Sequence, residues 1–216
     1  WFAQRFHRPQ LHAIAEMDGV LRLCGIEPRQ HSPVLHALAT DNQAIDERLD
    51  RLGVRGRRIA VFCPLTRWPT KNWPLSEFVD LVKKLPEDFF VIFTGTASEQ
   101  ALISEAVTRL APTRAASFAG CLSLPEYFAL VSIAQLVVTG DSLPMHVASA
   151  YNRPLVALFG PTDESRVAPR SEGSVVVRAD TDCHRCYRRS YCPRSCIGRI
   201  TVAQVAKAID EVLGAH

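Results

Sequence analysis

The amino-acid sequence predicts an α/β fold in which helices cover both faces of a parallel sheet. Four short apolar runs each end at a glycine or a proline, and helical patterns separate them. Continuous apolar runs, rather than alternating ones, are typical of parallel strands buried on both faces. Hydrophobic residues make up 47% of the 216 residues and charged residues 22%, which is enough apolar material for a sizeable core. The prediction is a doubly wound, Rossmann-like sheet.

The first fifty residues are predicted to be mostly helical and to precede this sheet. One loose helical stripe of apolar residues ends near Gly25, and a second helical stretch ends at Gly53. No strand pattern lies in this range for the stripe to pack on. We therefore expect residues 1–50 to be a linker, or the remnant of another domain, and residues 51–216 to be the α/β domain.

Within residues 51–216, strand and helix patterns alternate. Runs rich in Val, Ile and Phe predict strands, and a proline in the first turn favours several helix starts. The predicted strands are residues 58–63, 89–94, 115–118, 136–139, 154–159 and 175–177. The predicted helices begin at Pro74, near Ser98, at Leu124, at Ser142 and at Thr201.

Charge and hydropathy exclude some classes of protein. A net charge of +3 is too small to indicate a nucleic-acid or membrane-surface protein by itself. No apolar run approaches the ~20 residues of a membrane-spanning helix. The sequence begins at Trp1 without an initiating Met or the apolar core of a signal peptide, so we expect it to start within a longer chain.

The turn after the first predicted strand carries side chains that suit an anion. In an open parallel sheet, ligands bind beyond the carboxyl ends of the strands, where helix N-termini present free N–H groups. Residues 64–74 place the hydroxyl of Thr66 and the ammonium of Lys71 at this edge. An ordinary solvated loop with a structural tryptophan explains the same residues equally well.

Two further turns lie at the same predicted edge. In residues 140–146, Asp141 or Ser142 can cap a helix and leave the following N–H groups free for a phosphate, with His146 one turn into the helix. A capped helix with a half-buried histidine is the simpler explanation of this segment alone. Residues 159–163 alone indicate only a tight turn.

Taken together, the three turns resemble a known family. Lys71-Asn72-Trp73-Pro74 is similar to the K-x-W-P element of family 9 glycosyltransferases, the ADP-heptose:lipopolysaccharide heptosyltransferases. Residues 141–150 resemble the element D-S/T-G-x-x-H-x-A-A-A of that family, and residues 159–163 resemble F/Y-G-P-T-D. The elements occur in the family's order and at its spacing, and the resemblance runs from about residue 12 to the end.

The resemblance implies the GT-B fold, with two Rossmann-like domains facing a cleft. This chain would be the C-terminal, donor-binding domain with its linker. The implied activity is inverting, metal-independent transfer from an ADP-sugar, ADP-heptose above all, to a lipopolysaccharide core or a protein acceptor. The family's general base belongs to the N-terminal domain, so we expect this chain to lack it and to be an incomplete enzyme. The implied location is the cytoplasm, peripheral at the inner membrane.

The resemblance also assigns roles to particular residues. The implied donor-binding set is Thr66, Lys71, Glu99, Leu122, Asp141, Ser142, Leu143, Pro144 and His146. Thr66 and Lys71 would meet the diphosphate, and Asp141 would hold sugar hydroxyls. Lys71 and Asp141 are the implied catalytic residues, because a cation aimed at the leaving diphosphate stabilises the charge that develops there.

The remaining roles concern the nucleoside and the helix N-terminus. Glu99 would bind the ribose, and Leu122 would line the base pocket. Ser142 and the helix N-terminus up to His146 would complete the diphosphate site. Leu143 departs from the glycine of the family, which adds a side chain where the backbone should approach the ligand.

Four of the seven cysteines are clustered in a short loop. Their spacing is Cys183-x₂-Cys186-x₅-Cys192-x₃-Cys196, and four thiolates in a short segment suit a tetrahedral metal site. We expect a structural zinc or iron ion; a branch of the resembled family holds iron in such a loop. Two disulfides, or four reduced thiols without metal, are the alternatives.

The other three cysteines are expected inside the fold, and two alternative functions remain. Cys24, Cys63 and Cys121 stand in apolar contexts and are expected in the core. A non-catalytic module whose basic cysteine loop contacts nucleic acid or a protein is one alternative function. Tyr187 and Tyr191 are the loop's only aromatic residues, which argues against this alternative and against nucleic acid as a partner. A GT-B or epimerase-like enzyme for another nucleotide sugar is the other.

Overall fold

A six-stranded parallel sheet organises the chain, whose computed structural model describes residues 11–28, 34–183 and 185–214. The strands are β1 (Arg58–Cys63), β2 (Phe89–Phe93), β3 (Ala115–Ser117), β4 (Leu136–Gly140), β5 (Leu155–Phe159) and β6 (Ser174–Arg178). Their order is β3-β2-β1-β4-β5-β6, and every neighbouring pair is parallel. The predicted doubly wound, Rossmann-like sheet is therefore confirmed, with the reversal of strand order between β1 and β4.

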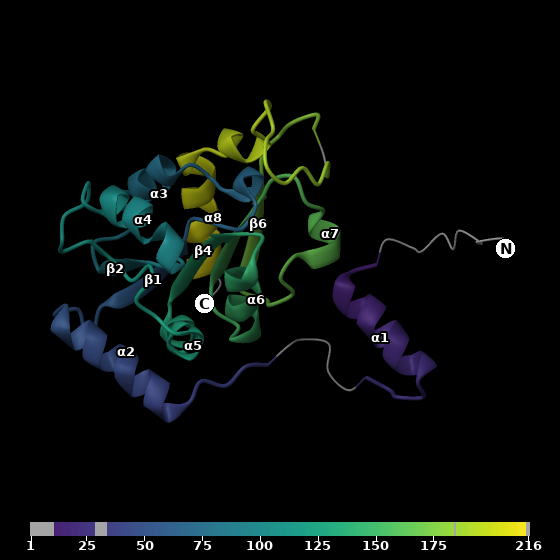
Figure 1. Cartoon of the computed structure of the whole chain (residues 1–216), viewed down its shortest axis with the longest axis horizontal. Coiled ribbons are helices and arrows are strands. Elements are labelled where there is room, and N and C mark those ends of the chain that lie inside the picture. The colour runs from purple at the N-terminus through teal and green to yellow at the C-terminus, as the bar shows by residue number, and fades with distance from the viewer. Residues whose placement is uncertain (1–10, 29–33, 184, 215–216) are drawn as a thin grey trace.

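Helices cover both faces of this sheet (Figure 1). The helices are α1 (Ala13–Leu23), α2 (Ala39–Arg51), α3 (Leu75–Val82), α4 (Gln100–Val107), α5 (Leu124–Ile133), α6 (Leu143–Ala150), α7 (Glu164–Val167) and α8 (Val202–Gly214). The 3₁₀ turns are η1 (Pro69–Lys71), η2 (Ala97–Glu99) and η3 (Cys196–Arg199). One core layer lies between the sheet and α3, α4 and α8, and the other lies between the sheet and α2, α5 and α6.

Side chains along each strand point alternately into these two core layers. In β1, Ala60 and Phe62 face one layer while Ile59, Val61 and Cys63 face the other. Both faces are therefore apolar, which is why the strand is a continuous hydrophobic run in the sequence. On the first face, the rings of Phe62 and Phe78 meet edge-on, with 5.7 Å between their centroids.

Helix α2 differs from the linker expected for residues 1–50. Its Ile45 and Leu49 are buried in the same core layer as β1, and α2 lies alongside α5. The ion pair between Arg48 and Glu126, at 3.0 Å, joins the two helices. Because two of its side chains complete the core, α2 packs as part of the α/β body, and this argues for a boundary before the helix. Residues 1–10 and 29–33 of the expected linker lie outside the described residues.

Helix α1 stands away from the sheet, on the α7 side (Figure 1). Its contacts with the α7 segment include His12 Nε2, 2.9 Å from the Ala168 carbonyl oxygen, and the ion pair of Glu16 with Arg166 at 3.0 Å. Apolar side chains of α1, such as Met17 and Leu23, remain exposed. Across the described part of the chain, no helix has both the length and the apolar character needed to cross a bilayer.

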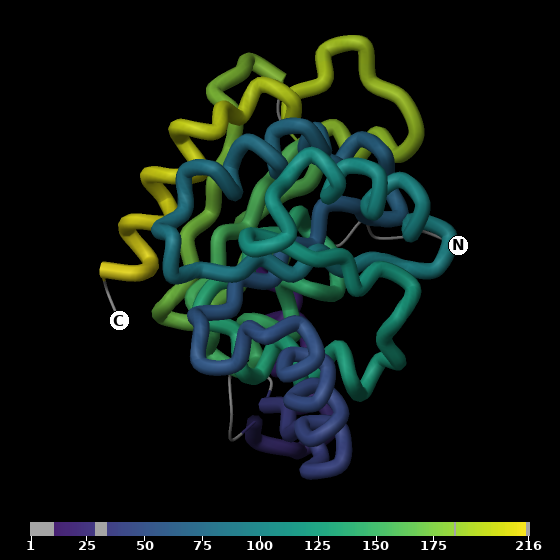
Figure 2. Tube along the Cα trace, turned by 90° about the vertical axis from the view of Figure 1, so that its left-hand side faces the viewer, coloured from purple at the N-terminus to yellow at the C-terminus, as the bar shows by residue number. Residues whose placement is uncertain are grey.

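The cysteine loop follows β6 and lies at the end of the sheet where the strands finish. Figure 2 shows it as the projecting bend near the yellow end of the chain, above the sheet. η3 and α8 follow it and return the chain to the first core layer through Ile197 and Ile200. The three expected cysteine positions outside this loop are corrected in part: Cys63 is buried, but Cys24 and Cys121 are exposed, because the one ends a peripheral helix and the other lies in a turn.

Candidate functional site

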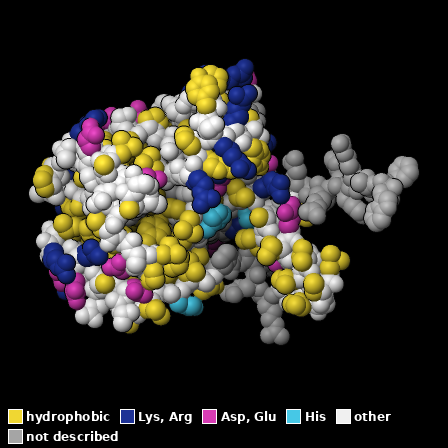
Figure 3. Space-filling view, in the orientation of Figure 1, with side chains coloured by type: hydrophobic (Ala, Val, Ile, Leu, Met, Phe, Trp, Pro, Cys, Tyr) yellow, Lys and Arg dark blue, Asp and Glu magenta, His cyan; other side chains and the backbone are white. Residues whose placement is uncertain are grey.

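A cavity of about 600 Å³ opens at the carboxyl ends of β1, β2 and β4. It lies at the reversal of strand order, where open α/β sheets bind their ligands. Figure 3 shows hydrophobic side chains gathered around the middle of this face, with basic side chains beside them. The lining combines an apolar side, which includes Leu65, Phe118 and Leu124, with polar groups from the turns that follow the strands.

The structure brings together eight of the nine residues predicted to surround the donor. Those that line the cavity are Thr66, Lys71, Glu99, Leu122, Asp141, Ser142, Leu143 and Pro144. They come from four separate segments of the chain, so their convergence is a property of the fold and not of their spacing in the sequence. The ninth residue, His146, is exposed and is not part of the lining.

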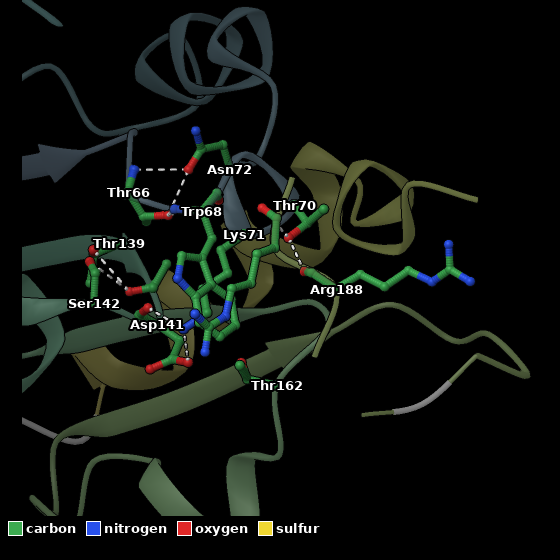
Figure 4. A network of polar contacts seen from close by, with 12 residues as sticks. Thr66, Trp68, Thr70, Lys71, Asn72, Thr139, Asp141, Ser142, Thr162 and Arg188 are labelled. Atoms are coloured by element: carbon green, nitrogen blue, oxygen red, sulfur yellow. Dashed lines mark hydrogen bonds and ion pairs between the residues drawn. The ribbon is translucent and has the colours of Figure 1, made fainter. Parts of the chain in front are cut away.

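A close ion pair lies in the wall of the cavity. Lys71 Nζ is 2.6 Å from Asp141 Oδ2 and also donates to the Asp141 carbonyl oxygen at 3.2 Å (Figure 4). Both side chains are largely buried, with 13% and 8% of their surface exposed. Gly140 permits this approach, since a Cβ there would lie 2.9 Å from the Lys71 carbonyl oxygen.

The first turn is held by its own hydrogen bonds. Asn72 Oδ1 accepts from the Thr66 backbone N–H at 2.8 Å and from the Thr66 hydroxyl at 2.9 Å. Trp73, the structural tryptophan of the turn, is buried and donates from Nε1 to the Ile200 carbonyl oxygen at 2.8 Å. Trp68 instead lines the cavity, with Lys71 Nζ 4.3 Å from its ring centroid. The turn is thereby fixed in a shape that presents Trp68 and Lys71 to the cavity.

Helix α6 points its N-terminus at the same wall. Ser142 stands at the N-cap with extended backbone, and its side chain makes no capping hydrogen bond. Pro144 has no N–H, and the Met145 N–H donates to the Ser142 carbonyl oxygen at 3.1 Å, so the Leu143 N–H is the donor that remains at this helix end. The partial positive charge of the helix end faces the cavity beside Lys71. This arrangement suits a phosphate or another anion.

The floor of the cavity was not predicted from the sequence. Cys63 Sγ lies 3.0 Å from Thr94 Oγ1 and 3.5 Å from the Tyr127 hydroxyl oxygen. Burial raises the pKa of the Cys63 thiol to about 11, and burial likewise raises the pKa of Tyr127. The floor is thus neutral and polar. A period-3.6 pattern marks Tyr127 only as a residue of a helix, so no signal in the sequence identified it.

Glu99 and Leu122 follow β2 and β3, on the side of the cavity away from Lys71, which follows β1. Glu99 Oε2 accepts from the Thr96 backbone N–H at 2.7 Å and closes a capping box at η2. Both residues line the cavity together with Thr96. The carboxylate therefore has a structural role, and its position in the lining also makes it available to a ligand.

His146 is influenced by the site without lining it. Partial loss of solvent lowers its pKa, the charges of His12 and Lys71 lower it further, and Asp141 opposes the change. The imidazole is accordingly neutral near pH 7. It is close enough to respond to a charge placed beside Lys71 and Asp141.

Buried Thr162, in the third turn, has no side-chain hydrogen-bond partner among the described residues. Its Oγ1 is buried and unpartnered, and Figure 4 shows the residue below the network that contains Lys71 and Asp141. Asp163 beside it is also buried, and burial alone would raise the pKa of its carboxyl group. The hydrogen bonds from Ser165 and the charge of Arg185 outweigh that effect and lower the pKa.

The four clustered cysteines do not form a compact metal site in the described residues. Cys196 is buried, Cys186 is exposed, and no three His, Cys, Asp or Glu side chains of that part of the chain are arranged to hold an ion. Burial raises the pKa of the Cys196 thiol, and the other three cysteines add to the effect. All seven cysteines, which the structure describes, are free thiols, so the alternative of two disulfides is contradicted.

Contacts tie the cysteine loop to the third turn. Arg185 Nε is 2.8 Å from Asp163 Oδ1, and the Tyr187 backbone N–H donates to the Pro161 carbonyl oxygen at 3.0 Å. Gly160 allows the loop to come close, because a Cβ at this position would lie 3.1 Å from Ile197 Cβ. The motif over residues 159–163 is therefore a docking turn for the loop.

Known proteins resemble this chain along most of its length. The model of glycosyltransferase family 9 (heptosyltransferase) matches residues 8–195. Lipopolysaccharide heptosyltransferase 2 of Escherichia coli K12 is 35% identical over 129 residues, which are 57% of this chain and 37% of that protein. Lipooligosaccharide heptosyltransferase 2 of Haemophilus influenzae is 30% identical over 159 residues, 71% of this chain and 43% of that protein.

A solved structure agrees with these relatives. The E. coli ADP-heptose lipopolysaccharide heptosyltransferase II superposes with a TM-score of 0.71 at 25% identity, over 87% of this chain and 56% of the other. The chain thus spans about half or less of the length of the relatives that it matches. It belongs to glycosyltransferase family 9, as the motifs in its three turns predicted.

Proposed function

We propose that this chain binds the nucleoside diphosphate sugar in a glycosyl transfer, with ADP-heptose as the donor. The observation that carries the proposal is the convergence of eight predicted donor residues on one cavity at the switch point of the sheet. The relatives named as heptosyltransferases, one of them as an ADP-heptose enzyme, support the choice of donor.

The cavity has the chemistry that a nucleotide sugar needs. Its apolar side, near Leu122 and Phe118, offers a face for a base, and Glu99 stands where a ribose would follow. Lys71 and α6 follow β1 and β4, whereas Glu99 and Leu122 follow β2 and β3, so the strand order separates the two groups. The separation of an apolar half from a polar half suits a ligand with an aromatic base at one end and a diphosphate at the other.

The same groups explain how the leaving group would be stabilised. In inverting transfer, the bond between the anomeric carbon and the diphosphate breaks while the acceptor oxygen attacks, and negative charge builds on the diphosphate. Lys71 and the Leu143 N–H at the start of α6 would meet that charge without a metal ion. Loss of one such group costs about 10²–10³ in rate by analogy with oxyanion donors.

Asp141 orients Lys71 and lines the cavity itself. Its Oδ2 is bound to Lys71 at 2.6 Å, so its second carboxylate oxygen remains available for hydroxyl groups of the sugar. Leu143 is half exposed at the cavity, where the family carries glycine. We propose that this side chain narrows the site next to the sugar and affects which donor is accepted.

The acceptor, the place in the cell and the general base belong to the same proposal. A lipopolysaccharide core is the proposed acceptor, by likeness to relatives named for it, and a protein acceptor is the alternative. The transfer would take place in the cytoplasm, at the inner membrane for a lipid-linked acceptor. The proposal gives this chain the donor half of the reaction and takes the acceptor's general base from an N-terminal domain of the family type.

A structural zinc or iron ion at the cysteine loop is a separate proposal. Four free thiols within fourteen positions, from Cys183 to Cys196, support it. Their present arrangement in the described residues does not fit an ion, so no step of the reaction is derived from one. Metal analysis of protein purified without chelator decides the matter: less than about half an equivalent of either metal refutes the proposal.

Calorimetric titration with ADP, UDP and GDP tests the proposed donor. We expect ADP to bind most tightly, and Lys71→Ala to weaken ADP binding at least tenfold through the lost contact to the diphosphate. Lys83→Ala is the matched control, because Lys83 is exposed and pairs with Asp80 at the same 2.6 Å. Preference for UDP or GDP would replace the proposed donor, and failure to bind any of the three nucleotides would refute the proposal.

A further inference from the structure

We propose that Arg189, on the cysteine loop, is a second phosphate-binding cation of the donor cavity and recognises the terminal phosphate of a nucleoside diphosphate. This inference rests on the proposed function and adds a residue that none of the three turn motifs contains. Arg189 lies 118 positions after Lys71 in the chain, yet both cations contact the same tryptophan.

Trp68 brings the two positive charges together. The Arg189 guanidinium carbon is 4.7 Å from the centroid of the Trp68 ring, and Lys71 Nζ is 4.3 Å from the same centroid. Trp68 and Lys71 both line the cavity. Arg189 is therefore held at the edge of the cavity that also carries Lys71.

Several contacts hold the backbone of the loop at this edge. The Thr70 hydroxyl donates to the carbonyl oxygens of Arg188 and Arg189, and Figure 4 shows Thr70 beside Arg188. Further back in the loop, Arg185 is bound to Asp163 and the Tyr187 N–H to Pro161. Since the loop is attached to both the first and the third turn, the position of Arg189 is built into the fold.

The charge balance favours a further cation beside Lys71, in addition to Arg67 of the cavity lining. Lys71 is already paired with Asp141, so the pair carries no net charge toward a ligand. Among the residues that the structure describes, no carboxylate lies within ion-pairing distance of Arg189. A diphosphate brings at least two negative charges, and the unpaired guanidinium supplies a cation that the Lys71–Asp141 pair does not.

Stacking also prepares the guanidinium for a phosphate. Contact with the indole occupies the face of the group and leaves the N–H donors at its edge. Those donors match two phosphate oxygens in a planar, bidentate contact. Because the terminal phosphate is what distinguishes a diphosphate from a monophosphate, Arg189 would favour ADP over AMP.

The test compares nucleotides and neighbouring arginines. ADP and AMP are titrated by calorimetry, at fixed ionic strength, into the unsubstituted chain, Arg189→Gln and Arg188→Gln. The control removes the same charge from the same loop, and Figure 4 shows the Arg188 side chain extending away from Trp68 and Lys71. Both arginines are exposed, so folding should be preserved, which circular dichroism checks.

We expect Arg189→Gln to weaken ADP binding about tenfold and AMP binding less than twofold, with Arg188→Gln within twofold for both nucleotides. Equal ADP affinities for the two variants would overturn the inference and leave the proposed function standing. An equal loss for ADP and AMP would also overturn it, since no terminal phosphate would then be recognised. If the unsubstituted chain binds no ADP, the proposed function fails first and this inference with it.

Discussion

Replacing Lys71 by methionine should destabilise the folded chain by about 3 kcal/mol at pH 7. The substitution keeps most of the apolar stem and removes the ammonium that lies 2.6 Å from Asp141 Oδ2. Asp141 has only 8% of its side chain exposed, so its carboxylate would remain buried without its cation. Breaking a buried pair from one side costs about 3–5 kcal/mol, and the small residual exposure favours the lower end.

Urea unfolding gives this number, and a double-variant cycle isolates the pair. Lys71→Met with Asp141→Asn should recover part of the loss, with a coupling energy of about 2 kcal/mol.

The chain supplies its own control for this experiment. Lys83 and Asp80 also form a 2.6 Å pair, but 60% and 53% of their side chains are exposed. Lys83→Met should therefore change the free energy of unfolding by no more than about 0.5 kcal/mol. If Lys71→Met and Lys83→Met cost the same, the argument that burial makes the Lys71–Asp141 pair strong would be wrong.

Three further outcomes follow from the same contacts. Gly140→Ala should lower the free energy of unfolding in urea by about 1–3 kcal/mol and weaken ADP binding, because its Cβ would lie 2.9 Å from a backbone oxygen. Gly214→Ala is the control: nothing lies within 4 Å of its Cβ, so the free energy of unfolding should change by no more than about 0.5 kcal/mol. A thiol reagent at pH 8 should label the exposed cysteines within minutes and Cys63 only on unfolding, since burial holds its pKa at about 11; fast labelling of Cys63 would contradict its placement. Asp163→Asn should destabilise the folded chain by about 1–2 kcal/mol at pH 7, and this difference should fade below about pH 4. The reason is that a carboxyl group with a lowered pKa stabilises the fold above its usual pKa and loses that effect as the pH falls through the lowered value. A difference that stays constant down to pH 2 would contradict the contact with Arg185.

The sheet could be predicted because each strand is specified locally. Both faces of β1 are apolar, and Pro64 marks its end, so a continuous hydrophobic run was sufficient evidence. Helix α7, with four residues, is too short to show a period and was not predicted. Helix α2 was predicted as a helix but placed in a linker, because its burial depends on α5, which is far away in the sequence.

The same division between local and distant contacts applies to the site. Lys71 and Asp141 belong to short motifs, and their types and positions in the sequence implied a shared function. Cys63, Tyr127 and Arg189 could not be found in this way, because each reaches the cavity only through the fold of other segments. The cysteine spacing likewise indicated a metal, whereas the described residues show the loop attached to two turns by other contacts.

A crystal structure of the chain with ADP tests the central claim most directly. We expect the base against Leu122 and the diphosphate within hydrogen-bonding distance of Lys71 Nζ and of the Leu143 N–H at the start of α6, with Arg189 at the terminal phosphate. The position of the diphosphate is decisive, because the proposed donor site, the stabilisation of the leaving group and the role of Arg189 all require it beside Lys71. ADP bound elsewhere, with this cavity empty, would contradict the assignment of the donor site.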